Sequence, residues 1–195
     1  MGKVRSALEI ALEKSERIGT LSEEEKARIK DEEQIRGTLA DFYQGRITSD
    51  ELWKRLKESN PSLIRTAQVN LVDSLGPGSA DMEFQMRKQG ILAIETLKKQ
   101  PNTSVIEMCL YSIEGLQKEY EKMKGSAVEE LRKHIEQNPQ LRMVPVKTGD
   151  GRTMQVAVSV DDAVKAKVAD LLSEHEEHYI NEFHALVEEL RKAVQ

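Results

Sequence analysis

The sequence predicts a mainly α-helical protein with one β-hairpin, and two changes of hydrophobic period support that prediction. Apolar residues recur at steps of three and four over most of residues 4–138 and again after residue 160, which is the spacing of amphipathic helices. Between residues 144 and 160 they fall on alternate positions around a glycine-containing turn at 148–151, which indicates two antiparallel strands. We therefore expect short N-terminal helices followed by two long antiparallel helices joined by the hairpin.

Length and composition favour one thin structural unit. The chain has 195 residues, which is enough for one domain. Only 38% of the residues are hydrophobic and 32% are charged, so thin layers of packed helices suit the chain better than a thick globule. We expect an N-terminal helical region at 1–100 and a helix, hairpin and helix at 101–195, which together form one unit.

Capping signatures predict where the N-terminal helices begin. A Ser or Thr followed three residues later by Glu can form a reciprocal cap, and this pattern occurs at Ser22 and at Thr48. Asn60 before Pro61 predicts another start, because Asn caps well and Pro fits the first turn. Ser79 is expected to cap the next helix. The expected helices span 4–18, 22–43, 48–56, 60–75 and 80–100.

A coiled-coil-like seam predicts one long helix at 103–138. Its apolar residues alternate steps of three and four from Ile106 through Cys109 onward. Ser126 offers a cap for a separate helix, but the stripe resumes beyond it after a shift of one position, as a stutter produces. We therefore expect one helix that ends before Pro139, with Cys109 buried on the seam and chemically inert.

The hairpin, at about 141–159, is the segment that we expect to meet a partner. A two-stranded hairpin is marginal by itself, so its apolar face must pack on the helices of this chain or on another chain. Pro145 marks the first strand as an edge strand, because proline cannot donate to a ladder. Ser159 then caps a final helix that runs to the C-terminus. The predicted interaction residues are Val144, Val146, Val156, Val158, Arg142, Lys147 and Arg152.

Charge gives little support to a nucleic-acid or membrane partner. The formal net charge is −5, so the chain as a whole lacks the basic footprint of such binders. Arg142, Lys147 and Arg152 make the hairpin locally basic, and one alternative function is therefore a nucleic-acid-binding or ribosome-associated factor. No run approaches the roughly 18 apolar residues that span a bilayer. We expect neither a nucleic acid nor a membrane as a partner.

A histidine and glutamate cluster on the final helix is the other alternative site. His175, His178 and Glu182 fall within an arc of roughly 60°, so they share a helix face. His175 and Glu182 lie about 10.5 Å apart along the axis, so one ion can use only an adjacent pair such as His178 with Glu182. A metal-binding protein or metal-dependent enzyme would need further ligands from elsewhere. His175 also continues an apolar stripe between Leu171 and Tyr179, which predicts a partly buried, structural histidine.

Two segments resemble a family of uncharacterised bacterial proteins. They are Lys3-Val-Arg-Ser-Ala-Leu-Glu-Ile-Ala-Leu-Glu-Lys14 and Asn138-Pro-Gln-Leu-Arg-Met-Val-Pro-Val-Lys-Thr-Gly-Asp-Gly-Arg152, and the resemblance covers the whole chain. It implies a protein of the bacterial cytoplasm, and it brings no activity and no catalytic residues. A single cysteine and the lack of a hydrophobic secretory segment at the N-terminus also favour the cytoplasm.

The favoured function is a non-catalytic interaction or scaffolding role. We expect a homo-oligomer, with a dimer favoured, together with a protein partner of unknown identity and no cofactor. This hypothesis rests on the long apolar seam, on the edge hairpin and on the lack of a specific catalytic motif in the sequence.

Overall fold

The computed structural model describes residues 22–147, 149 and 151–195. The predicted fold class is confirmed, because the described chain is mainly helical and contains one two-stranded antiparallel hairpin. The helix expected at 4–18 lies outside the described residues. The elements are α2 (Glu23–Tyr43), α3 (Ser49–Leu56), α4 (Pro61–Asp73), α5 (Asp81–Glu95), α6 (Thr103–Gln137), the short 3-10 helix η1 (Pro139–Arg142), β1 (Met143–Lys147), β2 (Thr153–Ala157) and α7 (Val160–Val194).

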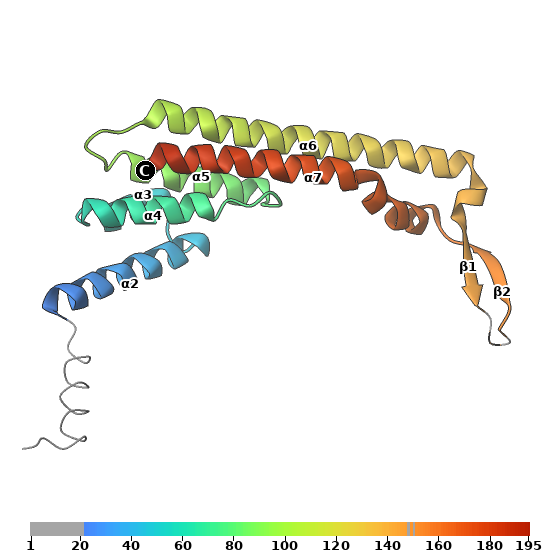
Figure 1. Ribbon diagram of the computed structural model, residues 1–195, viewed down its shortest axis with the longest axis horizontal. Coiled ribbons are helices and arrows are strands. Elements are labelled where there is room, and N and C mark those ends of the chain that lie inside the picture. The colour runs from blue at the N-terminus through green and yellow to red at the C-terminus, as the bar shows by residue number, and fades with distance from the viewer. Residues whose placement is uncertain (1–21, 148, 150) are drawn as a thin grey trace, which may run out of the picture.

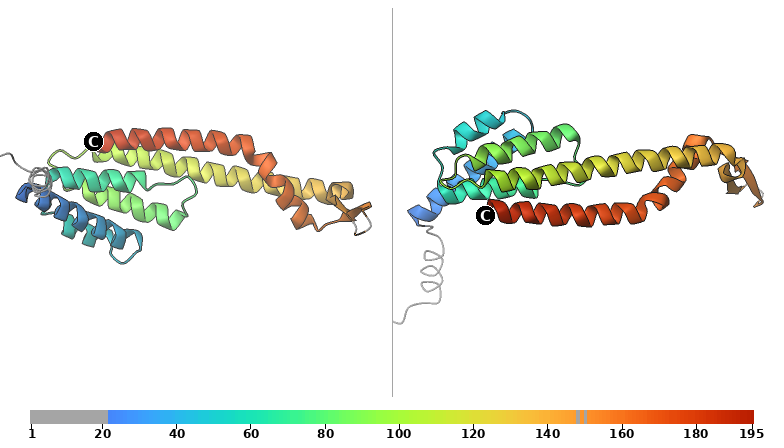
Figure 2. Two further views of the ribbon diagram at one scale, coloured as in Figure 1. Left: turned by 60° about the horizontal axis from the view of Figure 1, so that its bottom comes forward. Right: turned by 90° about the horizontal axis from the view of Figure 1, so that it is seen from above.

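The two long helices form an extended stalk. Helices α6 and α7 have 35 residues each, which corresponds to a length of about 50 Å. They run antiparallel and side by side, and α7 bends away from α6 toward the hairpin (Figures 1 and 2). The shorter helices α2–α5 gather around one end of the stalk, and the hairpin projects from the other end (Figure 1). In the described part of the chain, none of the helices contains an apolar stretch that could span a bilayer.

Three of the predicted helix starts are confirmed by their caps. The Thr48 N–H donates to the Glu51 carboxylate at 3.0 Å, and the Glu51 N–H donates to the Thr48 hydroxyl at 3.3 Å, which completes the reciprocal cap. The Asn60 side chain accepts from a backbone N–H in the first turn of α4. The Ser159 hydroxyl does the same for α7. These starts depend on residues within one turn of each other, which explains why the sequence predicts them.

The boundaries of α5 differ from the prediction. Its N-cap is Ala80, which makes no side-chain cap, and the helix spans Asp81–Glu95 instead of reaching residue 100. The Ser79 hydroxyl is used by the preceding loop, where it accepts from the Gly76 N–H at 3.3 Å and from the Arg87 guanidinium at 3.0 Å. The predicted cap was therefore wrong because its oxygen already has other donors.

The helix predicted at 103–138 is confirmed as one continuous helix, α6. Its buried residues include Ile106, Leu110 and Ile113. Cys109 is half-buried, and the prediction of a fully buried thiol is wrong because the step of four from Ile106 turns Leu110 inward instead. Partial burial still raises the pKa of the Cys109 thiol, with a further contribution from the nearby Glu189 carboxylate.

The hydrophobic core lies mainly at the end of the stalk where α2–α5 pack. This large cluster joins those helices to the first half of α6 and the last half of α7. A second, much smaller cluster lies at the hairpin end of the stalk. The largest fully buried side chains are those of Phe42, Phe84, Phe183, Leu52, Leu56, Leu71, Ile91, Ile94, Ile106, Leu110, Ile113 and Ile135. The residues of the small cluster with the least exposure are Ile135, Ala163 and Val164.

A buried carboxylate connects four parts of the helical end. Glu95 is fully buried, and its Oε2 lies 2.8 Å from Gln68 Nε2 of α4 and 2.8 Å from Lys98 Nζ. The other oxygen, Oε1, accepts from the backbone N–H of Asn102, which immediately precedes α6. Lys98 also donates to the Val194 carbonyl at the end of α7, at 2.7 Å. We call these five residues the Glu95 network.

A second polar contact joins α5 to α6. Glu114 of α6 accepts from Lys88 of α5 at 2.7 Å and from Lys118 of its own helix at 2.5 Å. These bonds, first to Lys118 and then to Lys88, lower the pKa of the Glu114 carboxyl from its ordinary value of 4.5 to about 2. The charged form of Glu114 therefore stabilises the contact between the two helices.

Replacing Gly90 by alanine should destabilise the protein. A Cβ atom at Gly90 would lie 2.7 Å from two ring carbons of Phe42, which is fully buried, so the ring would have to shift within the packed core. We expect a loss of about 1–3 kcal/mol in the free energy of unfolding. Gly115→Ala is the matched control, because its Cβ would meet nothing within 4 Å in the described structure; this change should stabilise α6 by about 0.5–1 kcal/mol. Urea denaturation followed by circular dichroism measures both, and equal stabilities for the two variants would contradict the packing at Gly90.

The lowered pKa of Glu114 predicts a loss of stability in acid. Because the folded pKa, about 2, lies below the ordinary value of 4.5, the stabilisation is fully present above about pH 4.5 and is lost as the pH falls toward 2. After allowance for solvent screening we expect a contribution on the order of 1 kcal/mol. Glu114→Gln should be less stable than the wild type at pH 7, and the difference should shrink at pH 3. A stability difference that does not depend on pH would show that the charge of Glu114 is not responsible.

Candidate protein-interaction surface

The hairpin is held at its base by the end of the stalk. The Arg142 side chain donates through Nε to the Val158 carbonyl at 2.8 Å, and the Val158 N–H donates to the Arg142 carbonyl at 2.9 Å. Val158 also packs against the small cluster that contains Ile135. The start of β1 and the end of β2 therefore have a fixed position relative to α6 and α7, while the rest of the hairpin extends beyond the stalk (Figure 1).

One face of the hairpin is built from apolar side chains. In the antiparallel register Val144 is opposite Val156, and Val146 is opposite Met154. Because side chains alternate between the two faces of a strand, these four residues lie on the same face. We call this set, Val144, Val146, Met154 and Val156, the apolar face. The predicted interaction residues include three of these four and omit Met154, although the alternating pattern includes it.

The apolar face is exposed in the described structure. The exposed fractions are 43% for Val146, 57% for Met154 and 43% for Val156, and Val144 is half-buried. The short helices α2–α5, which could have covered this face, lie at the opposite end of the stalk (Figure 1). A two-stranded ribbon has no core of its own, so the described chain leaves an apolar surface without a packing partner.

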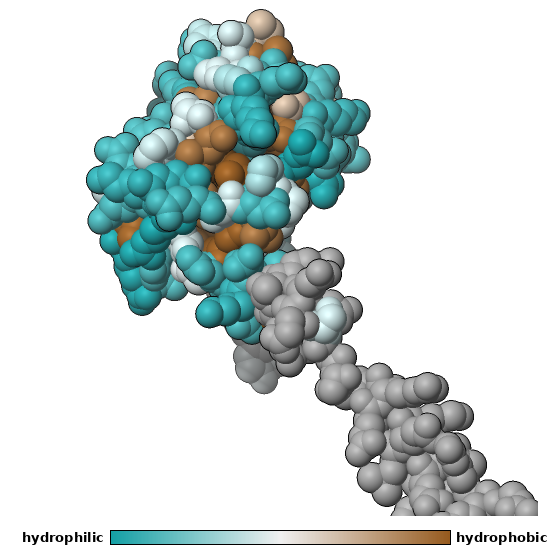
Figure 3. Space-filling model, turned by 90° about the vertical axis from the view of Figure 1, so that its left-hand side faces the viewer, coloured by the Kyte–Doolittle hydropathy of each residue, from teal (hydrophilic) through white to brown (hydrophobic). Residues whose placement is uncertain are grey.

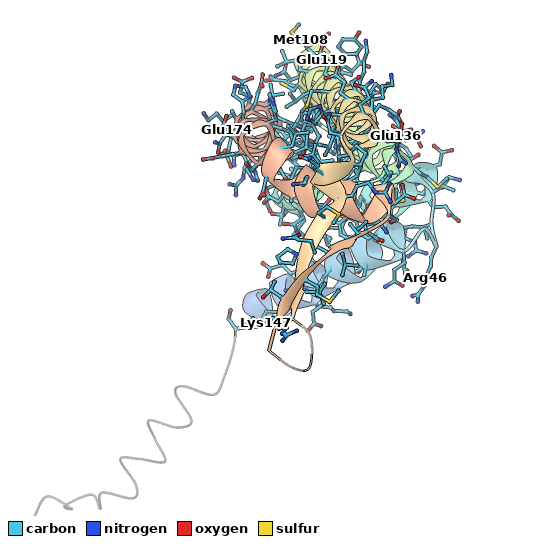
Figure 4. The ribbon with its side chains drawn as sticks, turned by 90° about the vertical axis from the view of Figure 1, so that its right-hand side faces the viewer. Arg46, Met108, Glu119, Glu136, Lys147 and Glu174 are labelled. Carbon is cyan, nitrogen blue, oxygen red and sulfur yellow. The ribbon has the colours of Figure 1, made fainter. Side chains whose placement is uncertain are left out.

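The remaining predicted interaction residues do not join this face. Val158 continues the alternation but packs into the small cluster at the base. Arg142 is used to bond Val158, whereas Lys147 lies near the far end of the hairpin (Figure 4). Five residues of extended strand correspond to about 16 Å. The expected basic tip is therefore divided, with Arg142 at the base and Lys147 and Arg152 at the turn.

A hollow at the other end of the molecule is another place where apolar side chains line the described surface. It lies between α2 and α4, has a volume of about 530 Å³, and is lined by Ile35, Leu39 and Leu63 together with polar residues. Those three side chains are at most 8% exposed, so they already belong to the core. Figure 3, which faces this end, shows hydrophobic residues in the hollows of a largely hydrophilic surface. The hairpin is therefore the stronger candidate for a protein contact.

The histidine cluster does not have the predicted arrangement. His175 is exposed, and so is Leu171, at 47%. The inner face of α7 instead runs through Leu172 and Tyr179, and the ring of Tyr179 stacks on Tyr120 of α6 with their centroids 4.1 Å apart. The prediction of a partly buried His175 is wrong because the buried stripe of α7 includes Leu172 and not Leu171.

The structure brings together only two of the three predicted ligands. His178 Nδ1 lies 3.6 Å from a Glu182 carboxylate oxygen, and both side chains are exposed. Among the described residues, no group of three or more His, Cys, Asp or Glu side chains is placed to hold a metal ion. The geometry of His175, His178 and Glu182 is that of a solvated helix face with one adjacent pair.

Comparisons with known proteins place the chain in a family without an assigned activity. No curated protein and no solved structure matches the chain. A family model described as "Family of unknown function (DUF6657)" matches residues 49–192, from the start of α3 almost to the end of α7. That match covers well over half of the chain and includes the stalk and the hairpin. The chain belongs to this family of unknown function, DUF6657.

Proposed function

We propose that the chain is a non-catalytic scaffolding protein that forms a homodimer through its hairpin. The observation that carries the proposal is the exposed apolar face of Val144, Val146, Met154 and Val156. Contiguous apolar surface away from the core is typical of a contact surface. Burying the exposed part of each of these side chains would contribute on the order of 1 kcal/mol.

The shape of the molecule supports a scaffolding role. The hairpin is at one end of a stalk of about 50 Å, and the large helical cluster is at the other end (Figure 2). Two copies joined at their hairpins would hold their helical ends far apart. Each helical end would then be free to bind a further protein, in keeping with the expected cytoplasmic scaffold.

The two alternative functions have weaker geometric support. A metal-dependent activity would have to start from the exposed pair of His178 and Glu182. Nucleic-acid binding would have to use basic residues that lie at opposite ends of the hairpin, on a chain with a net charge of −5. A contact through the apolar face would use side chains that already lie together on one face of the hairpin.

Val156→Asp tests the proposed dimer. The substitution places a carboxylate on the apolar face, where contact with the apolar side chains of a second copy would be costly, so the dimer should shift to a monomer. Helicity should be unchanged, because Val156 is exposed in the single chain. Sedimentation over a series of micromolar concentrations, with circular dichroism in parallel, measures both properties.

Met143→Asp is the matched control for this experiment. Met143 has the same exposed fraction as Val156, 43%, but its register partner is Ala157, so it lies on the opposite face of the hairpin. We expect this variant to remain a dimer. A wild-type chain that is monomeric at high micromolar concentration would exclude the proposed function.

A further inference from the structure

The two outer edges of the hairpin have different hydrogen-bonding capacity. Pairs along an antiparallel ladder alternate between hydrogen-bonded and non-hydrogen-bonded. The Val158 N–H bonds the Arg142 carbonyl, so that pair is hydrogen-bonded. Pro145 and Gln155 are three pairs further along the ladder, so they form a non-hydrogen-bonded pair. Their backbone N–H and C=O groups therefore point away from the partner strand.

The outer edge of β1 carries two protective features. Pro145 has no N–H, so the middle of this edge cannot donate to an added strand. Lys147, an exposed residue at the end of the same strand, adds a charge. Proline and lysine are the residues with which natural sheets prevent pairing at an edge.

The outer edge of β2 carries neither of these features. Thr153, Gln155 and Ala157 have outward-pointing backbone groups, because their register partners are Lys147, Pro145 and Met143 in the non-hydrogen-bonded positions. The strand reads Thr-Met-Gln-Val-Ala, without charge, proline or glycine, and all five residues are exposed. It is therefore an open edge that can accept another strand.

We propose that β2 pairs in antiparallel fashion with β2 of a second copy of this chain, which produces a four-stranded sheet. This inference rests on the self-association proposed above and specifies the contact. Four strands with one hydrophobic face exceed the minimum for an independently stable sheet, which the isolated hairpin does not reach. The symmetry is that of an isologous dimer, in which both copies use the same surface.

One register satisfies both the backbone and the side chains. With the two-fold axis at Gln155, this residue pairs with the partner's Gln155, and Thr153 pairs with the partner's Ala157, both through outward-pointing groups. Met154 then lies opposite the partner's Val156 on the apolar face. Met154 and Val156 of each copy therefore contact the other copy across the new pair of strands, and the two apolar faces join into one face of eight side chains.

Charge complementarity at the ends of the paired strands favours a second copy as the occupant. In this register Arg152 lies opposite the partner's Val158, one position before the serine that caps α7. The first turn of α7 carries Asp162 and Asp161, the second of which also pairs with Arg132 of its own chain at 2.7 Å. An arginine of each copy is thus brought toward an acidic helix start of the other, and the paired strands themselves bring no like charges together.

Disulfide trapping of Gln155→Cys tests the register, in a chain with Cys109 replaced by alanine. In the proposed sheet the two Cα atoms at this position are about 5.5 Å apart, which suits a disulfide. We expect a covalent dimer under mild oxidation, seen on a non-reducing gel. Lys147→Cys in the same background is the control, because the two copies of residue 147 would be about 20 Å apart. Cross-linking of Lys147→Cys to the same extent, or none at Gln155→Cys, would overturn the proposed register.

Gln155→Pro tests the edge by a second route. The change removes the outward N–H and leaves the pairing between β1 and β2 intact, because Gln155 is in a non-hydrogen-bonded pair. Two symmetric hydrogen bonds are lost, so we expect the dimer to weaken about thirtyfold. Pro145→Ala changes the outer edge of β1, so it should leave the dissociation constant of the dimer unchanged.

The outcomes separate this inference from the proposed function. In one outcome Val156→Asp dissociates the dimer, but Gln155→Pro does not weaken it and Gln155→Cys does not cross-link it. This outcome would support a contact through the hairpin and refute the pairing of β2 with β2. A wild type that is monomeric throughout would refute both. Weakening by Gln155→Pro together with selective cross-linking at position 155 supports the four-stranded sheet.

Discussion

The fold depends on the burial of one carboxylate. Glu95 is fully buried, and its oxygens receive donors from Gln68 of α4, from Lys98 and from the Asn102 backbone before α6. Lys98 extends the same network to the Val194 carbonyl at the end of α7. A buried carboxylate without such partners would strongly destabilise the protein. The helices at this end must therefore come together as a set, and the stalk is anchored there.

Packing decreases along the stalk away from this anchor. The large cluster extends as far as the stack of Tyr120 on Tyr179, and the far end is held by a small group around Ile135 and Val164. That group fixes the base of the hairpin through Val158 but has little surface with which to cover two strands. The chain has 38% hydrophobic residues, and those that are buried in the described part lie mostly at one end, which leaves a ribbon exposed at the other.

Features set by near neighbours in the chain could be predicted from the sequence, whereas features set by distant neighbours could not. The reciprocal cap of Thr48 with Glu51 and the period of the hairpin depend on residues a few positions apart, and both are confirmed. Glu95 gives no signal, because a buried carboxylate on a helix has the same local pattern as a solvated one. The prediction that His175 faces inward is wrong for a related reason. Steps of three and four do not decide whether Leu171 or Leu172 faces the core, and His175 follows Leu171.

The asymmetry of the two hairpin edges also limits the size of the proposed assembly. An interface of two five-residue strands is smaller than the roughly 1,200–2,000 Å² typical of stable complexes, so the proposed dimer would be reversible and its population would depend on protein concentration. Pairing through Gln155 uses the open edge of each copy and leaves Pro145 on both outer edges of the new sheet. A ribbon with two open edges could add copies without limit and form fibres. A ribbon with one protected edge closes at two copies, which is the property that a reversible scaffold requires.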